Sequence, residues 1–215
     1  MTASLPAGLG DRPAGPACRP AGPACRPAGS AYGVDPKGLR AVAPASASRP
    51  LRLLAQPEGL LQVHTAPHRG SFSAVLSQAI RSAGLGSDVL VCQFLKGGVN
   101  QGPGASPSLC GRLRWLRPAV EACIAEPAGD HAPQVLDAVQ EVWAFSRNQL
   151  LTAAVDLMVL DELGLAIDLG FLPAEEVLAV LERRPAPMDV ILTGPPMAPE
   201  LMALADQVTQ LRRGF

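Results

Sequence analysis

From Leu51 onward, short aliphatic runs alternate with longer segments of helical periodicity. This alternation is typical of β-α units in a parallel sheet, whose strands are covered on both faces and therefore read as continuous apolar runs. The predicted strands cover residues 59–65, 88–94, 156–161 and 189–193, with an edge strand at 207–211. The predicted helices cover residues 71–83, 133–154, 173–182 and 199–205, and residues 96–109 are predicted to be a Gly/Pro/Ser loop. The pattern predicts an α/β domain with a mainly parallel sheet.

The first 50 residues differ sharply from this domain. They contain nine prolines and seven glycines, and the heptapeptide RPAGPAC occurs twice, at residues 12–18 and 19–25. Such a segment has too few large apolar side chains to offset the entropy lost on ordering it. We therefore expect a disordered Pro/Gly-rich arm over residues 1–50 and one folded domain over residues 51–215.

The charge of the predicted domain limits its partners. Residues 1–50 hold six basic and two acidic residues, which leaves 12 basic and 17 acidic residues, a net charge of −5, for the rest. Nucleic-acid binding depends on Lys and Arg that neutralise phosphates, and a membrane span needs roughly 20 uninterrupted apolar residues. The sequence predicts neither partner. Its five cysteines form no C-x-x-C pair, which favours a reducing cytoplasm.

The segment after the first predicted strand reads TAPHRGSFS over residues 65–73. This is where a phosphate-binding P-loop would stand. In a working P-loop, glycines expose backbone N–H groups, a lysine neutralises phosphate, and a Ser or Thr hydroxyl binds Mg²⁺. Here Gly70 precedes the predicted helix, and Arg69, the residue before Gly70, offers a cation. Ser73 offers a hydroxyl one residue after the position where a P-loop has its Ser or Thr. An ordinary strand–loop–helix connection is the alternative interpretation.

Asp161 and Glu162 close the third predicted strand. A carboxylate at the end of a hydrophobic strand beside a phosphate loop is suited to hold Mg²⁺ or to orient a water on it. The alternative is helix capping, because Asp before a helix routinely accepts bonds from exposed N–H groups.

Several motifs occur in one order across the second half of the chain. Residues 156–185 read DLMVLDELGLAIDLGFLPAEEVLAVLERRP and residues 189–210 read DVILTGPPMAPELMALADQVTQ. This resembles the P-loop-type adenosyltransferases for cob(I)alamin and cob(I)yrinic acid a,c-diamide, in which LDE, EEV, RP, TGR, AP-x-L and AD-x-VTE follow in this order. LLQVHT, VCQFLKG and Trp143 also fall in the family's order, so the resemblance covers about residues 60–211.

The resemblance implies a three-layer P-loop NTPase-like fold and a part in cobalamin biosynthesis. Reduced cobalt of a corrinoid would attack the 5′ carbon of ATP and release triphosphate, with Mg²⁺ as cofactor. The implied partners are therefore a nucleotide and a corrinoid, and a homodimer is a candidate assembly. The residues implied for ATP are Thr65, Arg69, Gly70, Ser71, Ser73 and Lys96. Asp161 and Glu162 take the catalytic role, and Ser73 and Glu162 would hold the metal.

This sequence also departs from the family's pattern. Ser71 and Phe72 replace the loop lysine and threonine, Pro195 replaces the arginine after Thr-Gly, and Gln210 replaces the glutamate after Val-Thr. Losing the lysine removes a charge-assisted contact, and phenylalanine cannot bind Mg²⁺. Two hypotheses follow: an adenosyltransferase that tolerates an altered loop, or a non-catalytic paralogue that binds a nucleotide or corrinoid. Trp115 is a candidate to face the corrinoid, and packing on the sheet is the alternative.

Overall fold

The computed structural model describes residues 58–70, 72–98 and 101–212. Its seven strands form one sheet in the order β3-β4-β2-β5-β6-β1-β7. Every neighbouring pair is parallel except β3 and β4. The strands are β1 Leu61–Thr65, β2 Val89–Gln93, β3 Ser108–Leu109, β4 Leu113–Leu116, β5 Leu157–Asp161, β6 Asp189–Gly194 and β7 Gln207–Gln210. The mainly parallel sheet predicted from the sequence is confirmed, whereas the predicted arm lies outside the described residues.

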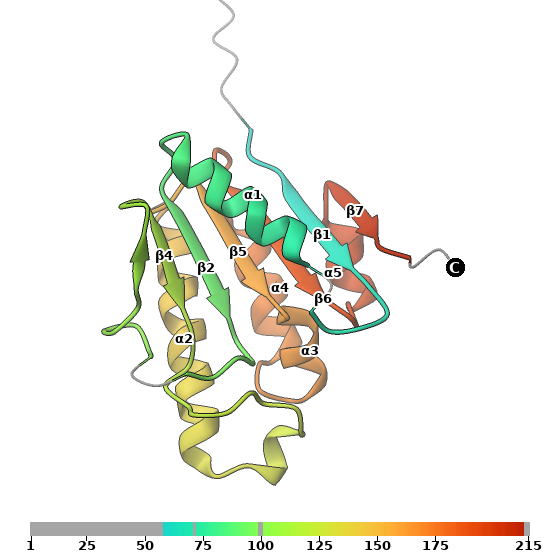
Figure 1. Ribbon diagram of the computed structural model, residues 1–215. Coiled ribbons are helices and arrows are strands. Elements are labelled where there is room, and N and C mark those ends of the chain that lie inside the picture. The colour runs from blue at the N-terminus through green and yellow to red at the C-terminus, as the bar shows by residue number, and fades with distance from the viewer. Residues whose placement is uncertain (1–57, 71, 99–100, 213–215) are drawn as a thin grey trace, which may run out of the picture. The chain divides into compact units, whose positions relative to one another are not determined.

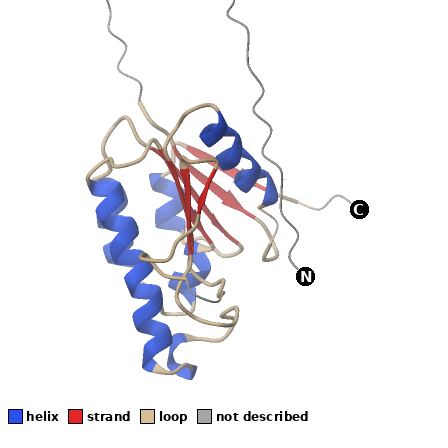
Figure 2. Ribbon diagram, turned by 60° about the vertical axis from the view of Figure 1, so that its left-hand side comes forward, coloured by secondary structure: helices blue, strands red, loops and turns tan. Residues whose placement is uncertain are grey.

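Helices cover both faces of the sheet, as Figure 1 and Figure 2 show. They are α1 Ser73–Gly84, α2 Pro133–Leu151, α3 Leu163–Asp168, α4 Ala174–Glu182 and α5 Pro199–Leu204, with a 3₁₀ turn at Ala128–Asp130. In the described part of the chain, no helix combines the length and the apolar character needed to cross a bilayer.

Alternate strand residues build two separate cores. On one face, Val91 and Val159 pack with the α1 side chains Val75 and Ala79. On the other face, strand residues such as Leu160 pack against α2, α3, α4 and α5. The fully buried strands therefore read as continuous apolar runs because they meet helices on both sides. The three-layer α/β arrangement is confirmed.

The structure adds a strand pair where the sequence predicted a loop. β3 ends the predicted loop 96–109, and β4 follows it and pairs in parallel with β2. β4 is only four residues long, and Arg112, Arg114 and Arg117 within and around it break the apolar pattern. Its strand structure comes from pairing with β2, which local sequence does not reveal.

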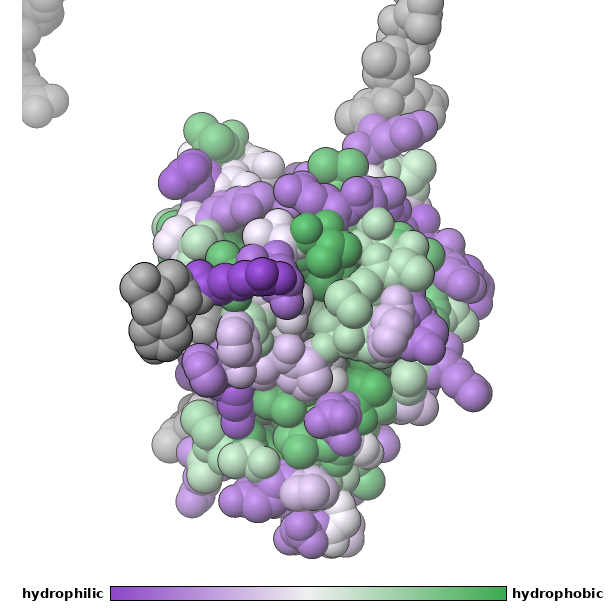
Figure 3. Space-filling view, turned by 90° about the vertical axis from the view of Figure 1, so that its right-hand side faces the viewer, coloured by the Kyte–Doolittle hydropathy of each residue, from purple (hydrophilic) through white to green (hydrophobic). Residues whose placement is uncertain are grey.

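β7 lies at the opposite edge of the sheet, beside β1. Asp206 fixes its start: its carboxylate accepts bonds from the Leu61 N–H and from Arg184, each at 2.7 Å. The backbone bond from Leu61 is the largest cause that lowers the pKa of Asp206. Figure 3, a view of the side that carries β7 and α5, shows hydrophobic side chains in separate groups among hydrophilic ones. Because β7 runs parallel to β1, residues 211–212 lie at the same end of the strands as the loop after β1.

Candidate functional site

Four central strands, β1, β2, β5 and β6, end at one edge of the sheet. Their terminal or near-terminal residues include the polar residues Thr65, Gln93, Asp161 and Thr193. The crevice beyond the carboxyl ends of parallel strands is where open α/β folds bind ligands. The candidate site therefore lies at this edge.

Asp161 is the centre of a buried hydrogen-bond network. Its side chain is 2% exposed, and Lys96 Nζ lies 3.0 Å from its Oδ2 atom. Gln93 Nε2 donates to the same oxygen at 2.7 Å. Thr193 Oγ1 donates to Oδ1 at 2.7 Å. A buried carboxylate that accepts three hydrogen bonds, one of them from a cation, is held in one orientation.

Glu162 is held in an unusual backbone conformation. Its φ angle is 60°, in the left-handed region that non-glycine residues rarely adopt. The Glu162 N–H donates to Thr193 Oγ1 at 3.0 Å, so one threonine hydroxyl links both acidic residues. Glu162 stands at the N-cap of α3, yet it makes no side-chain cap hydrogen bond. Its carboxylate therefore does not serve the helix cap considered from the sequence.

Arg69 contacts this second carboxylate. Its Nε donates to Glu162 Oε1 at 3.0 Å and its Nη2 to Oε2 at 2.6 Å, while Nη1 donates to the Ile124 carbonyl at 2.8 Å. The hydrogen bond to Glu162 is the largest cause that raises the pKa of Arg69. The loop arginine and the strand-end glutamate, both named from the sequence, are thus joined to each other.

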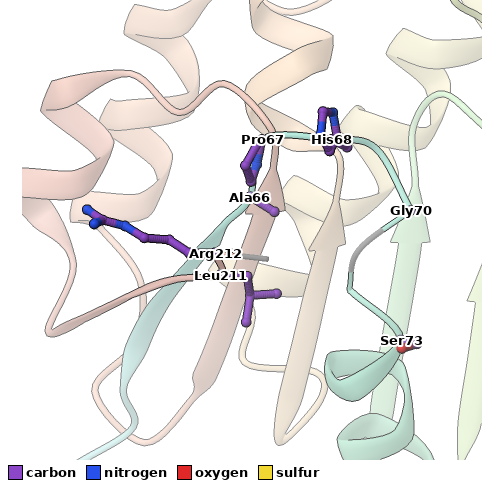
Figure 4. Close-up of a pocket in the computed structure, with 7 residues that line it drawn as sticks. All are labelled: Ala66, Pro67, His68, Gly70, Ser73, Leu211 and Arg212. Carbon is purple, nitrogen blue, oxygen red and sulfur yellow. The ribbon is translucent and has the colours of Figure 1, made fainter. Parts of the chain in front are cut away.

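The loop after β1 borders a cavity of about 330 Å³. Its lining residues, drawn in Figure 4, are Ala66, Pro67, His68, Gly70, Ser73, Leu211 and Arg212. Gly70 has a φ of 75°, which its missing Cβ permits. Thr65 Oγ1 donates to the Pro195 carbonyl at 3.0 Å, which ties the loop to the end of β6. Ser71 lies outside the described residues.

A smaller cavity, of about 90 Å³, connects the loop to the network around Asp161. Gly70, Ser73, Lys96 and Asp161 are among the residues that line it. The structure thus brings together four residues named from the sequence, drawn from three separate segments. Their backbone N–H groups, hydroxyl and ammonium are groups that bind phosphate.

Phe72 explains one departure from the family's loop. Its side chain is 3% exposed and packs in the core beneath α1 with Val75 and Ala79. Phenylalanine at this position therefore stabilises the seating of α1, and a threonine would leave a cavity there. Phe72 also lines the smaller cavity, at the position where the resemblance implies a hydroxyl.

Arg212 is a candidate that sequence reasoning missed. It lines the larger cavity and donates to Gln210 Oε1 at 3.1 Å. In Figure 4 its side chain extends away from Gly70 and Ser73, and an exposed side chain of this kind changes rotamer within nanoseconds. The parallel pairing of β7 with β1 is the signal that would have placed it at this edge.

A second cluster lies beside the network, at the end of β4. Trp115 Nε1 and Arg117 Nε donate to Gln93 Oε1 at 2.7 and 2.8 Å, and Gln93 in turn bonds Asp161. Trp115 and Arg117 also line a mostly apolar hollow of about 220 Å³. Trp115 is half-buried, so one part of its ring packs on the sheet while another part faces this hollow.

The residues available for a metal ion do not suit Mg²⁺ at Glu162. Both Glu162 oxygens accept bonds from Arg69, and Phe72 stands where the resemblance implies a hydroxyl ligand. Across the described ranges, no three His, Cys, Asp or Glu side chains gather as a ligand set. Ser73 lies exposed at the start of α1. The metal ligands expected from the sequence, Ser73 and Glu162, stay a prediction, but with the Arg69 pair formed the site does not fit the ion.

The parallel sheet, the loop before α1 and the polar strand ends define an α/β protein whose ligand site is expected at the carboxyl ends of its strands. The family model described as ATP:corrinoid adenosyltransferase BtuR/CobO/CobP matches residues 57–214, and the chain belongs to this family. It is 32% identical to the corrinoid adenosyltransferase CobA of Salmonella typhimurium over 162 residues, covering 73% of this chain and 78% of that protein. It is 31% identical to the corrinoid adenosyltransferase of Escherichia coli K12, covering 72% and 76%. The Pseudomonas aeruginosa corrinoid adenosyltransferase is 29% identical, covering 71% and 74%.

Proposed function

We propose that this chain transfers the 5′-deoxyadenosyl group of ATP to the reduced cobalt of a corrinoid. In this reaction the cobalt electron pair forms a bond to the 5′ carbon, and the carbon–oxygen bond of ATP breaks. The oxygen leaves with its electron pair as part of inorganic triphosphate. A reductant outside the chain keeps the cobalt in its nucleophilic state. The use of ATP agrees with the cytoplasmic location expected from the sequence.

The observation that carries the proposal is the cavity shared by the loop and the Asp161 network. Negative charge builds on the departing triphosphate, so groups that favour it lower the barrier. We assign this role to Lys96, to the backbone N–H groups at the start of α1, and to the Ser73 hydroxyl. Asp161 is a positioning residue that holds the Lys96 ammonium at the cavity.

The corrinoid is proposed to approach from the Trp115 hollow. This hollow offers an aromatic ring and apolar side chains, which suit a large flat ligand. Gln93 bonds both Trp115 and Asp161, so it links the proposed corrinoid side to the phosphate side. Such a link would place the two substrates on either side of β2.

An anaerobic transfer assay tests the proposal. Purified full-length chain is mixed with ATP, a corrinoid and a strong reductant, and the adenosylated corrinoid and triphosphate are counted. One triphosphate is expected per corrinoid product. Lys96→Ala is expected to lower kcat/KM by about 10–100-fold, because a charge-assisted contact to the leaving group is lost.

Arg112→Ala is the matched control for this substitution. Arg112 is also a cation paired with one carboxylate, Asp88. It directly precedes β4, so it lies at the amino ends of the parallel strands, away from the candidate site. Its removal should change kcat/KM less than about twofold, since surface ion pairs contribute little. Absence of any corrinoid product, with ATP still bound, would instead support the second candidate.

The second candidate is a non-catalytic protein that binds the nucleotide or the corrinoid. Two observations favour it: Phe72 is built into the core where the family has a hydroxyl, and Arg69 is paired with Glu162. In each case a side chain that could contact a ligand instead contacts another part of this chain: Phe72 packs in the core, and Arg69 bonds Glu162. Binding without transfer would then be the activity retained.

A further inference from the structure

We propose that the Arg69 guanidinium is a built-in counter-cation for Glu162, which takes the place of a divalent metal ion at this carboxylate. The inference concerns the site of the proposed function and rests on that proposal for its catalytic meaning. Its test uses neither ATP nor a corrinoid, so the two can fail separately.

The geometry of the Arg69–Glu162 pair leaves no free carboxylate oxygen facing solvent. The guanidinium meets the carboxylate through two parallel bonds, Nε to Oε1 and Nη2 to Oε2. This fork-to-fork arrangement is the strongest that arginine makes with a carboxylate. The Glu162 side chain is 2% exposed, against 33% for Arg69, so the cation covers the carboxylate on the solvent side. A metal ion can reach Glu162 only after Arg69 has left.

Charge balance points the same way. The site holds two buried carboxylates, Asp161 and Glu162, and two cations, Lys96 and Arg69, each paired with one carboxylate. The four charges sum to zero. A divalent ion on Glu162 would add two positive charges to a site that is already neutral, whereas an unpaired buried carboxylate would be costly. Arg69 therefore neutralises the Glu162 carboxylate, which a bound metal ion would otherwise neutralise.

The backbone supports this substitution. The left-handed conformation of Glu162 and the bond from its N–H to Thr193 aim the carboxylate toward the loop. From the loop, Arg69 is anchored a third time, by the Ile124 carbonyl. Phe72 packs in the core and also lines the smaller cavity, where it offers no hydroxyl as the metal ligand that the resemblance implies. The two bonds of Arg69 to Glu162, its bond to Ile124 and the absence of a hydroxyl at Phe72 thus favour the arginine over the ion.

Thermal unfolding of the full-length chain, with and without 10 mM Mn²⁺ (a concentration of about this order suffices for a weak carboxylate site), tests the proposal. The wild-type Tm is expected to be unchanged by Mn²⁺. Arg69→Gln should have a lower Tm, because Glu162 is left without its cation. Mn²⁺ should then raise the Tm of Arg69→Gln by about 2–4 °C, because the freed carboxylate binds the ion in the folded state only.

Two further variants decide the interpretation. Arg69→Gln combined with Glu162→Gln removes both charges, so it should recover part of the lost Tm and show no response to Mn²⁺. Arg69→Lys keeps a cation and should also show no response, which provides a folded reference if Arg69→Gln does not fold. A Mn²⁺ response of the wild type that disappears in Glu162→Gln would overturn the proposal. So would a folded Arg69→Gln without a response, or a response that survives in the double variant.

Discussion

Asp161→Ala is expected to lower the free energy of unfolding by about 3 kcal/mol and to weaken ATP binding by about 10–100-fold, because Asp161 acts on ATP through Lys96. The substitution removes the acceptor of three bonds at once, from Gln93, Lys96 and Thr193. The Lys96 ammonium, with a side chain 28% exposed, loses its counter-charge and its fixed position. Urea unfolding at pH 7 measures the loss of stability, and calorimetry measures the weakening of ATP binding.

Asp168→Ala is the control for this result. Asp168 is the last residue of α3, only seven positions along the chain, and it is exposed. Removal of an exposed carboxylate should change the unfolding free energy by no more than about 0.5 kcal/mol. Equal losses in the two variants would show that the Asp161 network does not contribute as described.

Gly164→Ala is expected to destabilise the fold by about 3 kcal/mol, because α3 touches the loop after β6 at this residue. A Cβ added to Gly164 would overlap with the Pro196 carbonyl oxygen, a backbone atom that cannot turn aside. The neighbouring Leu163 is buried in the core, so α3 cannot simply move outward. Any shift of α3 would also displace Glu162, and ATP binding should weaken with it.

Gly84→Ala is the matched substitution. Gly84 ends α1, and a Cβ added there would have no heavy atom within 4 Å. Alanine favours the helix, so stability should stay equal or rise by up to about 1 kcal/mol. Urea unfolding compares the two variants, and a Gly164→Ala protein as stable as Gly84→Ala would contradict the close approach of α3 to Pro196.

The elements that sequence could predict are those whose pattern is local. β2 and β5 are buried along their whole length, and their aliphatic runs identified them within one residue at each end. The helix after Glu162 was considered only through its N-cap, and its bounds were not predicted because α3 has only six residues and shows little periodicity. β4 was missed because its own residues show no strand pattern, and its strand structure depends on pairing with β2.

Several residues predicted for the site lie together in the structure, but Gln93, Thr193 and Arg212 were not predicted, and neither were the contacts. Strand ends indicated Asp161 and Glu162, and the loop pattern indicated Arg69. Which carboxylate meets which cation depends on the left-handed turn at Glu162 and on Thr193, which bonds Asp161 from 32 residues away. Gln93 bonds Asp161 across 68 residues. Contacts of this range arise from strand order, which a single sequence does not encode locally.

Titration of the full-length chain with ATP by calorimetry tests most directly whether the altered loop still forms a nucleotide site. The triphosphate is proposed to bind at the loop, Lys96 and the start of α1, so ATP should bind in the micromolar range and AMP far more weakly. Heats of dilution alone for ATP, from a chain shown to be folded by its cooperative unfolding, would contradict the account.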